Sequence, residues 1–228
     1  MRVKVADAQA KGEAAILTAK QIRGLLGWLK ENRPMVYLWG LLQGAAGLRN
    51  YEAIYLTEAD LDYEHRTIRV TSNAAHRVKT AASNRTLPVA EAILKALAEW
   101  TAGLKVRSLD GFIFKTRYGR HYKPRTVVEM WQEALGAARV AGVDLPEGFI
   151  ARRMRASFVT AMREGGADFA VLQRYIGHRP DTTMTMHYER IGVERLKAVA
   201  TLAEQLIAGA GAYAEPEKKD AINGGVLH

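Results

Sequence analysis

Four basic side chains and one tyrosine stand out in this 228-residue sequence by their residue types and their context. Arg49 follows a Gly-Leu pair, Lys79 lies in a polar stretch, and Arg155 belongs to an arginine-rich run. His178, directly after a glycine, and Tyr188 come later. Guanidinium groups bind phosphate oxygens through paired N–H donors, a lysine can donate a proton, and a phenol oxygen can act as a nucleophile. These are the groups that phosphoryl chemistry uses.

Each residue also has an ordinary structural interpretation. Arg49 is typical of a solvated or ion-paired helix residue, and Lys79 of an exposed hairpin lysine. His178 suits the C-terminus of a helix, where a partly positive imidazole interacts favourably with the helix dipole. Tyr188 is one of nine tyrosines and could simply pack. The functional interpretation therefore depends on the order of the motifs and on the elements that carry them.

Most of those elements are expected to be helices. Thr18 can cap a helix and form a capping box with Gln21, and an apolar face follows at helical spacing, made of Ile22, Leu25, Leu26 and Leu29. Pro34 suits the first turn of a second, buried helix that ends near Gly44 and Gly47. Further helices are expected over residues 91–104, 124–141, 151–164, 169–176 and 193–208.

A small sheet interrupts these helices. Residues 67–71 alternate between polar and apolar types, residues 85–89 resemble a second short strand, and the polar segment between them holds Lys79. Residues 112–114 form a brief apolar, strand-like run. The expected fold class is mainly α with a small antiparallel β-sheet insertion (α+β).

The amino-acid composition excludes several kinds of site and favours one class of binding partner. The 33 Lys and Arg residues against 24 Asp and Glu residues give a net charge of +9, which favours a polyanionic partner, with nucleic acid ahead of an anionic membrane. The absence of cysteine excludes disulfides, cysteine-based zinc sites, iron–sulfur clusters and thiol nucleophiles. No apolar run in the sequence is long enough for a membrane span, and no secretion signal is apparent, so a cytoplasmic or nucleoid-associated protein is expected.

The ordered set of motifs resembles the tyrosine recombinase (phage integrase) family. In the first half, the resemblance is carried by Gly47-Leu48-Arg49-Asn50-Tyr51-Glu52 and by Lys79-Thr80 ahead of Arg85-Thr86-Leu87-Pro88. In the second half, it is carried by Met154-Arg155-Ala156-Ser157-Phe158, Gly165-Gly166-Ala167-Asp168, Ile176-Gly177-His178, Thr182-Thr183-Met184 and Tyr188. It covers roughly residues 17–208 and implies the tyrosine recombinase catalytic-domain fold.

The resemblance also implies an activity. A site-specific recombinase of this type cleaves and rejoins DNA through a 3′-phosphotyrosyl intermediate, with neither metal nor ATP and with no cofactor. The family pattern assigns the phosphate clamp to Arg49 and Arg155, the proton for the leaving 5′-oxygen to Lys79, and the nucleophile to Tyr188. His178 would hydrogen-bond the scissile phosphate or assist at the tyrosine. A free phenol has a pKa of about 10, so the surrounding cations must favour its phenolate form.

Two departures from the family pattern are apparent. The family usually has a histidine three residues before the second arginine and often another directly after it, where this sequence has Arg152 and Ala156. Arg152 can still donate to the phosphate but cannot act as a base, because arginine does not deprotonate in proteins; its ordinary interpretation is a surface cation. Family members also usually carry an N-terminal DNA-clamping domain, and only residues 1–16 precede the pattern here. We therefore expect a catalytic-domain fragment, with a minimal recombinase as the alternative.

The expected organisation is a flexible leader over residues 1–16, a catalytic domain over residues 17–208 and a flexible tail over residues 209–228. The implied partner is double-stranded DNA with a specific recombination site, bound by a homo-oligomer, a tetramer, that the C-terminal helix joins. That helix carries an apolar stripe of Val193, Leu196, Val199, Ala200, Ala203, Leu206 and Ile207. Packing of the stripe on its own domain is the open alternative.

Two other functions compete with the recombinase. A catalytically silent DNA-binding regulator, or a decayed integrase, would keep the fold and lack turnover, as the departures at Arg152 and Ala156 allow. A metal-dependent nuclease would need clustered acidic ligands. Asp60, Asp62 and Glu64 lie close together in the sequence, but acids in such a place are more often turn residues.

Overall fold

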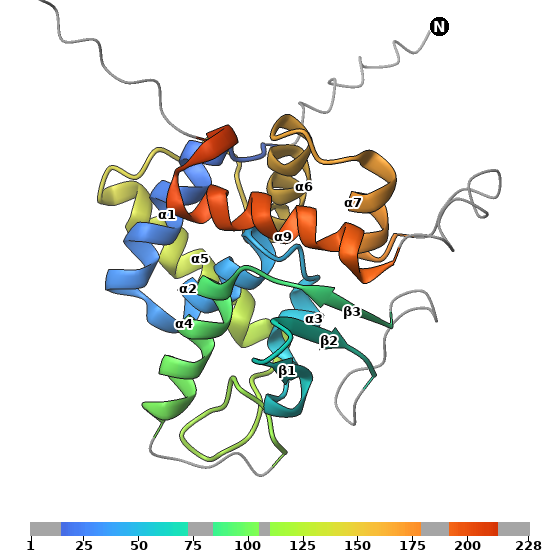
Figure 1. Cartoon of the computed structure of the whole chain (residues 1–228). Coiled ribbons are helices and arrows are strands. Elements are labelled where there is room, and N and C mark those ends of the chain that lie inside the picture. The colour runs from blue at the N-terminus through green and yellow to red at the C-terminus, as the bar shows by residue number, and fades with distance from the viewer. Residues whose placement is uncertain (1–14, 73–83, 105–109, 179–191, 214–228) are drawn as a thin grey trace, which may run out of the picture.

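The computed structural model describes residues 15–72, 84–104, 110–178 and 192–213 as a body of helices with a small antiparallel sheet (Figure 1). The helices are α1 (Ala19–Asn32), α2 (Pro34–Gly44), α3 (Asn50–Ile54), α4 (Glu91–Ala102), α5 (Pro124–Val140), α6 (Met154–Glu164), α7 (Phe169–Ile176) and α9 (Val193–Ala208). The strands are β1 (Leu61–Asp62), β2 (Thr67–Val70) and β3 (Arg85–Pro88). The expected fold class is thereby confirmed. None of the helices that the structure describes is long and apolar enough to cross a membrane.

The first two helices begin where the sequence predicts. Thr18 Oγ1 accepts a hydrogen bond from the Gln21 amide at 3.3 Å, and Gln21 Oε1 accepts one from the Thr18 amide at 3.0 Å. The four apolar residues expected on the inner face of α1 are all buried. Pro34 occupies the first turn of α2, which ends at Gly44. The core starts at Leu17, whose side chain is buried and whose amide donates to Ser157 Oγ at 2.9 Å.

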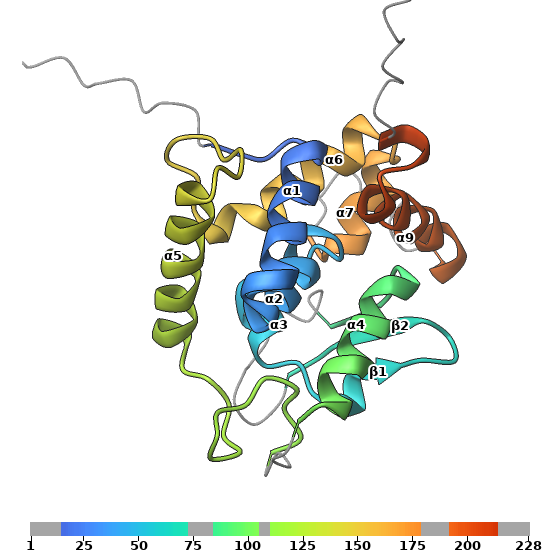
Figure 2. The ribbon, with the colours of Figure 1, turned by 90° about the vertical axis from the view of Figure 1, so that its left-hand side faces the viewer.

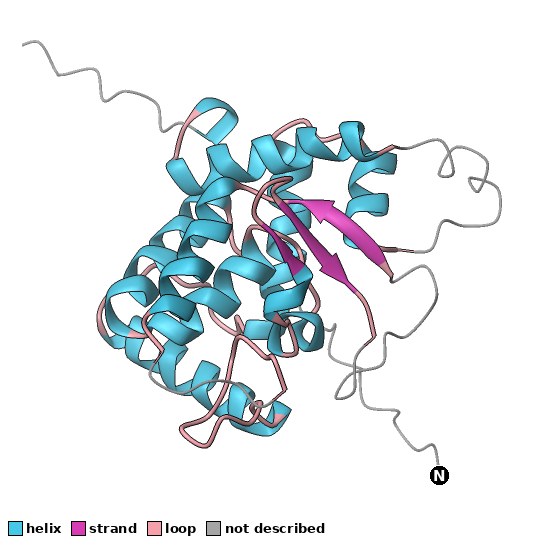
Figure 3. Ribbon diagram, turned by 60° about the horizontal axis from the view of Figure 1, so that its bottom comes forward, coloured by secondary structure: helices cyan, strands magenta, loops and turns pink. Residues whose placement is uncertain are grey.

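The sheet contains both predicted strands and one short additional strand. Its order is β1-β2-β3, with antiparallel pairing throughout (Figure 3). Ile68 lies opposite Leu87, and both side chains are buried. Lys79 falls outside the described residues. The strand-like run over residues 112–114 does not form a strand of this sheet. Phe112 makes only an isolated bridge to Thr57, because the chain turns into the 3-10 helix Glu58–Asp60 directly afterwards.

Three further segments differ from expectation. The short helix α3 was not foreseen, because five residues are too few to show a helical period. The helix expected over residues 151–164 starts as a 3-10 turn, Ala151–Arg153, before α6. The tail expected to be flexible from residue 209 begins instead with a 3-10 turn, Gly211–Tyr213, because Tyr213 is buried and its hydroxyl donates to Ala161 O at 2.7 Å.

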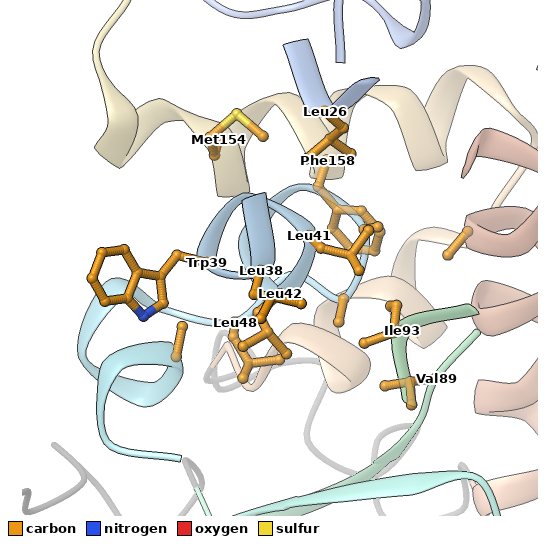
Figure 4. Close-up of a cluster of buried hydrophobic side chains, with 14 of the residues drawn as sticks. Leu26, Leu38, Trp39, Leu41, Leu42, Leu48, Val89, Ile93, Met154 and Phe158 are labelled. Atoms are coloured by element: carbon orange, nitrogen blue, oxygen red, sulfur yellow. The ribbon is translucent and has the colours of Figure 1, made fainter. Parts of the chain in front are cut away.

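Helices α1 and α2 form the centre of the body, between α5 on one side and α7 and α9 on the other (Figure 2). The core between α1, α2 and α6 is built from large apolar side chains, including Leu26, Leu41, Leu42, Met154 and Phe158 (Figure 4). Gly47 lies close against this core. Its φ is +65°, and a Cβ at this position would come within 2.7 Å of the Phe158 ring. A glycine is therefore needed where the chain leaves α2 for α3.

Helix α9 packs on its own domain. It lies against α7 and β3 and also contacts α1, α4 and α6, and it buries Leu196, Val199, Ala200, Ala203 and Leu206. The apolar stripe seen in the sequence therefore makes an intramolecular contact, while Val193, at the start of the helix, remains exposed.

Candidate active site

The site is built around the C-terminal end of α7. Asp168 caps the helix at its start by accepting from the Val171 amide at 2.9 Å. At its end Gly177 adopts a left-handed conformation with a φ of +67°. The Gly177 and His178 amides bond back to Arg174 O at 3.1 Å and Gln173 O at 3.0 Å. This glycine-based cap turns the chain sharply. The carbonyls of the residues around the turn have no partner within the helix and point to other elements.

Three arginines from three different elements each bind one of three consecutive carbonyls at this end. Arg85, the first residue of β3, donates from Nε to Tyr175 O at 3.0 Å. Arg155, in the first turn of α6, donates from Nη2 to Ile176 O at 2.7 Å. Arg49, just before α3, donates from Nη2 to Gly177 O at 2.9 Å. Because the carbonyl end of a helix carries partial negative charge, it attracts guanidinium groups and fixes where they lie.

A single buried carboxylate joins the same arginines. Glu52 is 2% exposed and forms a two-pronged ion pair with Arg85, at 3.1 Å from Nη1 and 2.9 Å from Nη2. Arg49 donates to Glu52 from Nη1 and from its amide, both at 2.8 Å. Arg155 Nη1 lies 3.8 Å from Glu52 Oε2. Burial opposes ionisation of this carboxyl, but the hydrogen bonds and charge of Arg85, with the bonds from Arg49, lower the pKa of Glu52 to about 2.

We refer to Arg49, Arg85, Arg155 and Glu52 as the arginine cluster, and to Arg49 and Arg155 as the clamp arginines. Three positive charges and one negative charge leave the cluster with a net charge of +2. Burial and the neighbouring positive charges of Arg49 and Arg85, partly offset by Glu52, lower the pKa of Arg155 to about 9, so it stays charged at neutral pH. An anion placed here would relieve this repulsion.

The clamp arginines keep hydrogen-bond donors for such an anion. A guanidinium has five N–H donors. Within the described residues, Arg49 uses two side-chain donors, on Glu52 and Gly177, and Arg155 uses two, on Gly47 O at 2.7 Å and on Ile176. The Arg49 side chain is 35% exposed and that of Arg155 is 14% exposed, so both can be reached from solvent.

His178 follows the glycine turn directly and is exposed. Burial of part of its ring, and the positive charges of Arg155, Arg49 and Arg85, lower the pKa of His178. The imidazole is therefore neutral at neutral pH while no anion is bound. The His178 amide takes part in closing the helix, but a neutral imidazole does not supply the partly positive charge that the cap interpretation assumes.

The structure thus brings together Arg49, Arg155 and His178 of the predicted site residues. Arg152 lies one turn before Arg155, in the 3-10 turn that precedes α6, and is exposed. No hydrogen bond or ion pair of its side chain is seen among the described residues. Lys79 and Tyr188 lie outside the described residues, so their roles remain predictions.

Sequence reasoning missed Glu52 and Arg85. Both stand inside motifs that carried the family resemblance, so the signal was their position within those motifs, not their residue type. The role of Glu52 and Arg85 is visible only in the folded chain, where α3 and β3 bring the two side chains into an ion pair.

Two acids considered as metal ligands are used locally instead. Asp60 Oδ2 accepts from the Thr57 amide at 3.0 Å and from Thr57 Oγ1 at 2.6 Å. Asp62 accepts from the His65 amide at 2.9 Å and pairs with its ring at 2.8 Å. Both fit the structural role of turn residues that the sequence favoured.

The arrangement is suited to holding an oxyanion with at least two negatively polarised oxygens. Its guanidiniums are fixed before any ligand arrives, so little reorganisation is needed when charge develops on a bound group. Paired donors on the clamp arginines match the geometry of phosphate.

Known proteins share both the sequence pattern and the fold. The family model described as "Phage integrase family" matches residues 15–195. The tyrosine recombinase XerC of a Mycobacterium species is 31% identical over 159 residues, which cover 68% of this chain and 49% of the relative. The tyrosine recombinase XerA of Pyrococcus furiosus is 27% identical over 200 residues, covering 85% of this chain and 64% of the relative. The chain thus spans about half the length of XerC and somewhat less than two thirds of XerA.

Solved structures give the same architecture. The crystal structure of a XerA recombinase matches with a TM-score of 0.60 at 20% identity, covering 82% of this chain and 64% of that one. A complex of the Tn1549 transposon integrase with circular intermediate DNA matches with a TM-score of 0.64 at 22% identity, covering 83% of this chain and 67% of that one. With the fold and the matched residues in agreement, this chain belongs to the phage integrase family.

Proposed function

We propose that this chain is the catalytic domain of a site-specific DNA recombinase that cleaves and rejoins double-stranded DNA through a phosphotyrosyl intermediate. The observation that carries the proposal is the convergence of Arg49 and Arg155. Guanidiniums from the start of α3 and from α6 bind adjacent carbonyls and approach one carboxylate, and among the residues that the structure describes neither has a partner for every donor. Such a pair can hold the two non-bridging oxygens of one DNA phosphate. The relatives named as tyrosine recombinases, and the transposon integrase solved with DNA, support a DNA substrate.

The proposed cleavage step uses residues of this chain alone. The Tyr188 phenol oxygen attacks phosphorus, a Tyr–O–P bond forms, and the bond from phosphorus to the 5′-oxygen breaks. Lys79 gives a proton to the leaving 5′-oxygen. His178, neutral because its pKa is lowered, can accept a hydrogen bond or the phenol proton. The new phosphodiester conserves the energy of the old one, so reversal by a 5′-hydroxyl rejoins the strand without ATP.

In this scheme the arginine cluster stabilises the negative charge of the transition state. The transition state carries more negative charge on its oxygens than the bound phosphodiester does. Donors fixed in advance stabilise it by several kcal/mol each when they replace reorganising water, on the order of a lost oxyanion-hole donor. Arg152, one turn from Arg155, adds a third possible donor in place of the histidine usual in the family.

We further propose that the active form is a homo-oligomer, a tetramer, assembled on a DNA recombination site, with the catalytic unit over residues 17–208. Because α9 buries its apolar face in its own domain, assembly through the C-terminal helix would need exchange of α9 between copies or use of its exposed side. Light scattering on DNA, with and without residues 193–228, tests this, and a monomer in both states would discard it. With DNA as the proposed substrate, we propose that the protein acts in the cytoplasm, at the nucleoid or in the interior of a viral host cell.

The alternative is a DNA-binding regulator of the same fold that has lost turnover. The observation in its favour is that Arg152 and Ala156 stand at two positions where the family often has histidine. Such a protein would keep the phosphate clamp and bind DNA without forming a covalent bond.

One experiment separates the two. The chain is incubated with a pool of randomised duplexes, each carrying a nick, so that a cut next to the nick releases a short fragment and traps the adduct. Denaturing gels detect the covalent complex, and sequencing of the trapped DNA identifies the target. The recombinase predicts an adduct that Tyr188→Phe abolishes while DNA binding remains. Binding without any adduct in the unmodified chain would support the regulator.

The proton donor has its own test. Lys79→Ala slows cleavage, and a substrate whose 5′-bridging oxygen is replaced by sulfur, a better leaving group, restores the rate. Failure of this rescue would assign the acid to another residue.

A further inference from the structure

We propose that Arg85 is a positioning residue for the cleavage reaction. From strand β3 it holds Glu52 and the end of α7 in the arrangement that directs both clamp arginines at one phosphate. This inference rests on the proposed function and adds to it a residue that makes no direct contact with the reacting atoms.

Burial separates Arg85 from the clamp arginines. Its side chain is 6% exposed, against 35% for Arg49 and 14% for Arg155. It also turns all three of its nitrogens inward, with Nε on Tyr175 O and both Nη atoms on Glu52. A phosphate that reaches Arg49 from solvent would not displace these bonds. Arg85 therefore binds groups of the protein and does not contact the substrate.

The contacts of Arg85 lead directly to Arg49. Arg85 binds both oxygens of Glu52 in a planar fork, which fixes the rotation of that carboxylate. The same two oxygens accept from the Arg49 side chain and amide. Rotation of the carboxylate would therefore move the Arg49 guanidinium away from Gly177 O.

A second path leads through α7 to Arg155. Tyr175 is tied to β3 twice, because its carbonyl accepts from Arg85 Nε and its buried hydroxyl donates to Pro88 O at 2.8 Å. A Cβ on Gly177 would lie 3.0 Å from Arg85 Nη1, so the glycine turn rests directly on the Arg85 side chain. The carbonyls of residues 176 and 177, which orient the clamp arginines, belong to this turn.

The test compares two Arg85 variants with a control from the neighbouring strand. Arg85→Gln removes the charge and the fork, and Arg85→Lys keeps the charge but loses the fork. Arg69 is the matched control. It lies on β2, donates to Ala59 O at 3.2 Å and pairs with Asp60 at 3.8 Å, and so makes the same kinds of contact away from the cluster. Arg69→Gln should leave both readouts below unchanged.

The first readout is the rate of adduct formation at saturating DNA. Because a displacement of about 1 Å in a catalytic group can cost about 10²-fold in rate, we expect a loss of that order for Arg85→Gln and a partial loss for Arg85→Lys. The affinity for DNA should change much less than the rate. In a Glu52→Gln background, Arg85→Gln should cost less than it does alone, because the path through the Glu52 carboxylate is already lost and only the path through α7 remains. Additive losses in the double variant, or equal losses in rate and affinity, would overturn the proposal.

The second readout does not depend on catalysis. Nuclear relaxation of the Arg49 Nε–H group reports how rigidly its guanidinium is held. We expect its order parameter to fall in both Arg85 variants and to stay unchanged in Arg69→Gln. If the unmodified chain forms no adduct, the recombinase proposal fails, and the positioning role is decided by this measurement alone. An Arg49 side chain that stays equally ordered without Arg85 would overturn it.

Discussion

Replacement of Glu52 by glutamine tests the centre of the arginine cluster. Glu52→Gln keeps the shape of the side chain but removes its negative charge and turns one acceptor into a donor that faces a guanidinium. The pKa of Glu52 falls from a model-peptide value of 4.5 to about 2 on folding. At about 1.4 kcal/mol for each pKa unit, ionised Glu52 contributes about 3 kcal/mol to the free energy of unfolding. That agrees with the 3–5 kcal/mol, roughly, lost when one partner of a buried ion pair is removed.

The sign of the pH dependence follows from the lowered pKa. The contribution is fully present above pH 4.5 and is lost as the pH falls towards 2, because the unfolded chain takes up the proton first. We expect urea unfolding at pH 7, followed by tryptophan fluorescence, to show Glu52→Gln less stable than the unmodified chain by about 3 kcal/mol. At pH 3 about half of this difference should remain.

A matched control comes from an exposed ion pair. Glu133 lies 3.4 Å from Arg33 and its side chain is 72% exposed, so Glu133→Gln should change the free energy of unfolding by less than about 1 kcal/mol. Equal stability of Glu52→Gln and the unmodified chain at pH 7, or a difference that stays constant from pH 7 to pH 3, would refute the reasoning.

Three other predictions concern the same cluster. Gly177→Ala should destabilise the fold by more than Gly166→Ala. Both positions have a positive φ, which costs an alanine about 1–2 kcal/mol of strain, but only the Cβ at position 177 would also crowd Arg85. Thermal unfolding of the two variants measures the difference. Arg49→Lys should reduce the adduct-forming rate by about 10²–10³-fold, since an ammonium cannot span Glu52 and Gly177 O together, and single-turnover kinetics on nicked DNA would expose a smaller loss. An NMR titration should give a His178 pKa below 6.5 that rises on addition of inorganic phosphate; a midpoint indifferent to phosphate would separate His178 from the cluster.

Local signals in the sequence were sufficient for most helices. The Thr18 capping box and the apolar spacing after it located α1, and α7 spans the predicted residues 169–176. These signals succeed because capping and amphipathic burial depend on neighbours within a turn or two. Short elements such as α3 and β1 carry too few residues for a period to emerge.

The residues of the candidate site also differ in whether the sequence alone could predict them. The proximity of Arg49, Arg155 and His178 could be predicted, because the order of the motifs that hold them was informative without coordinates. Glu52 and Arg85 could not be predicted as partners, since 33 positions separate them and nothing in either residue type announces the ion pair. The same limit explains why the apolar stripe of α9 could be recognised while the surface that it covers could not.

The three carbonyls at the end of α7 also determine at which stage of folding the arginine cluster can form. Their arginine partners come from positions 49, 85 and 155, and the bond from Arg49 to Gly177 spans 128 positions of the chain. A nascent or partly unfolded polypeptide therefore has no clamp, because each guanidinium is oriented only once all of these segments have docked. Under the proposed function, DNA cleavage therefore requires a completed fold, and an incompletely folded copy would not cleave DNA.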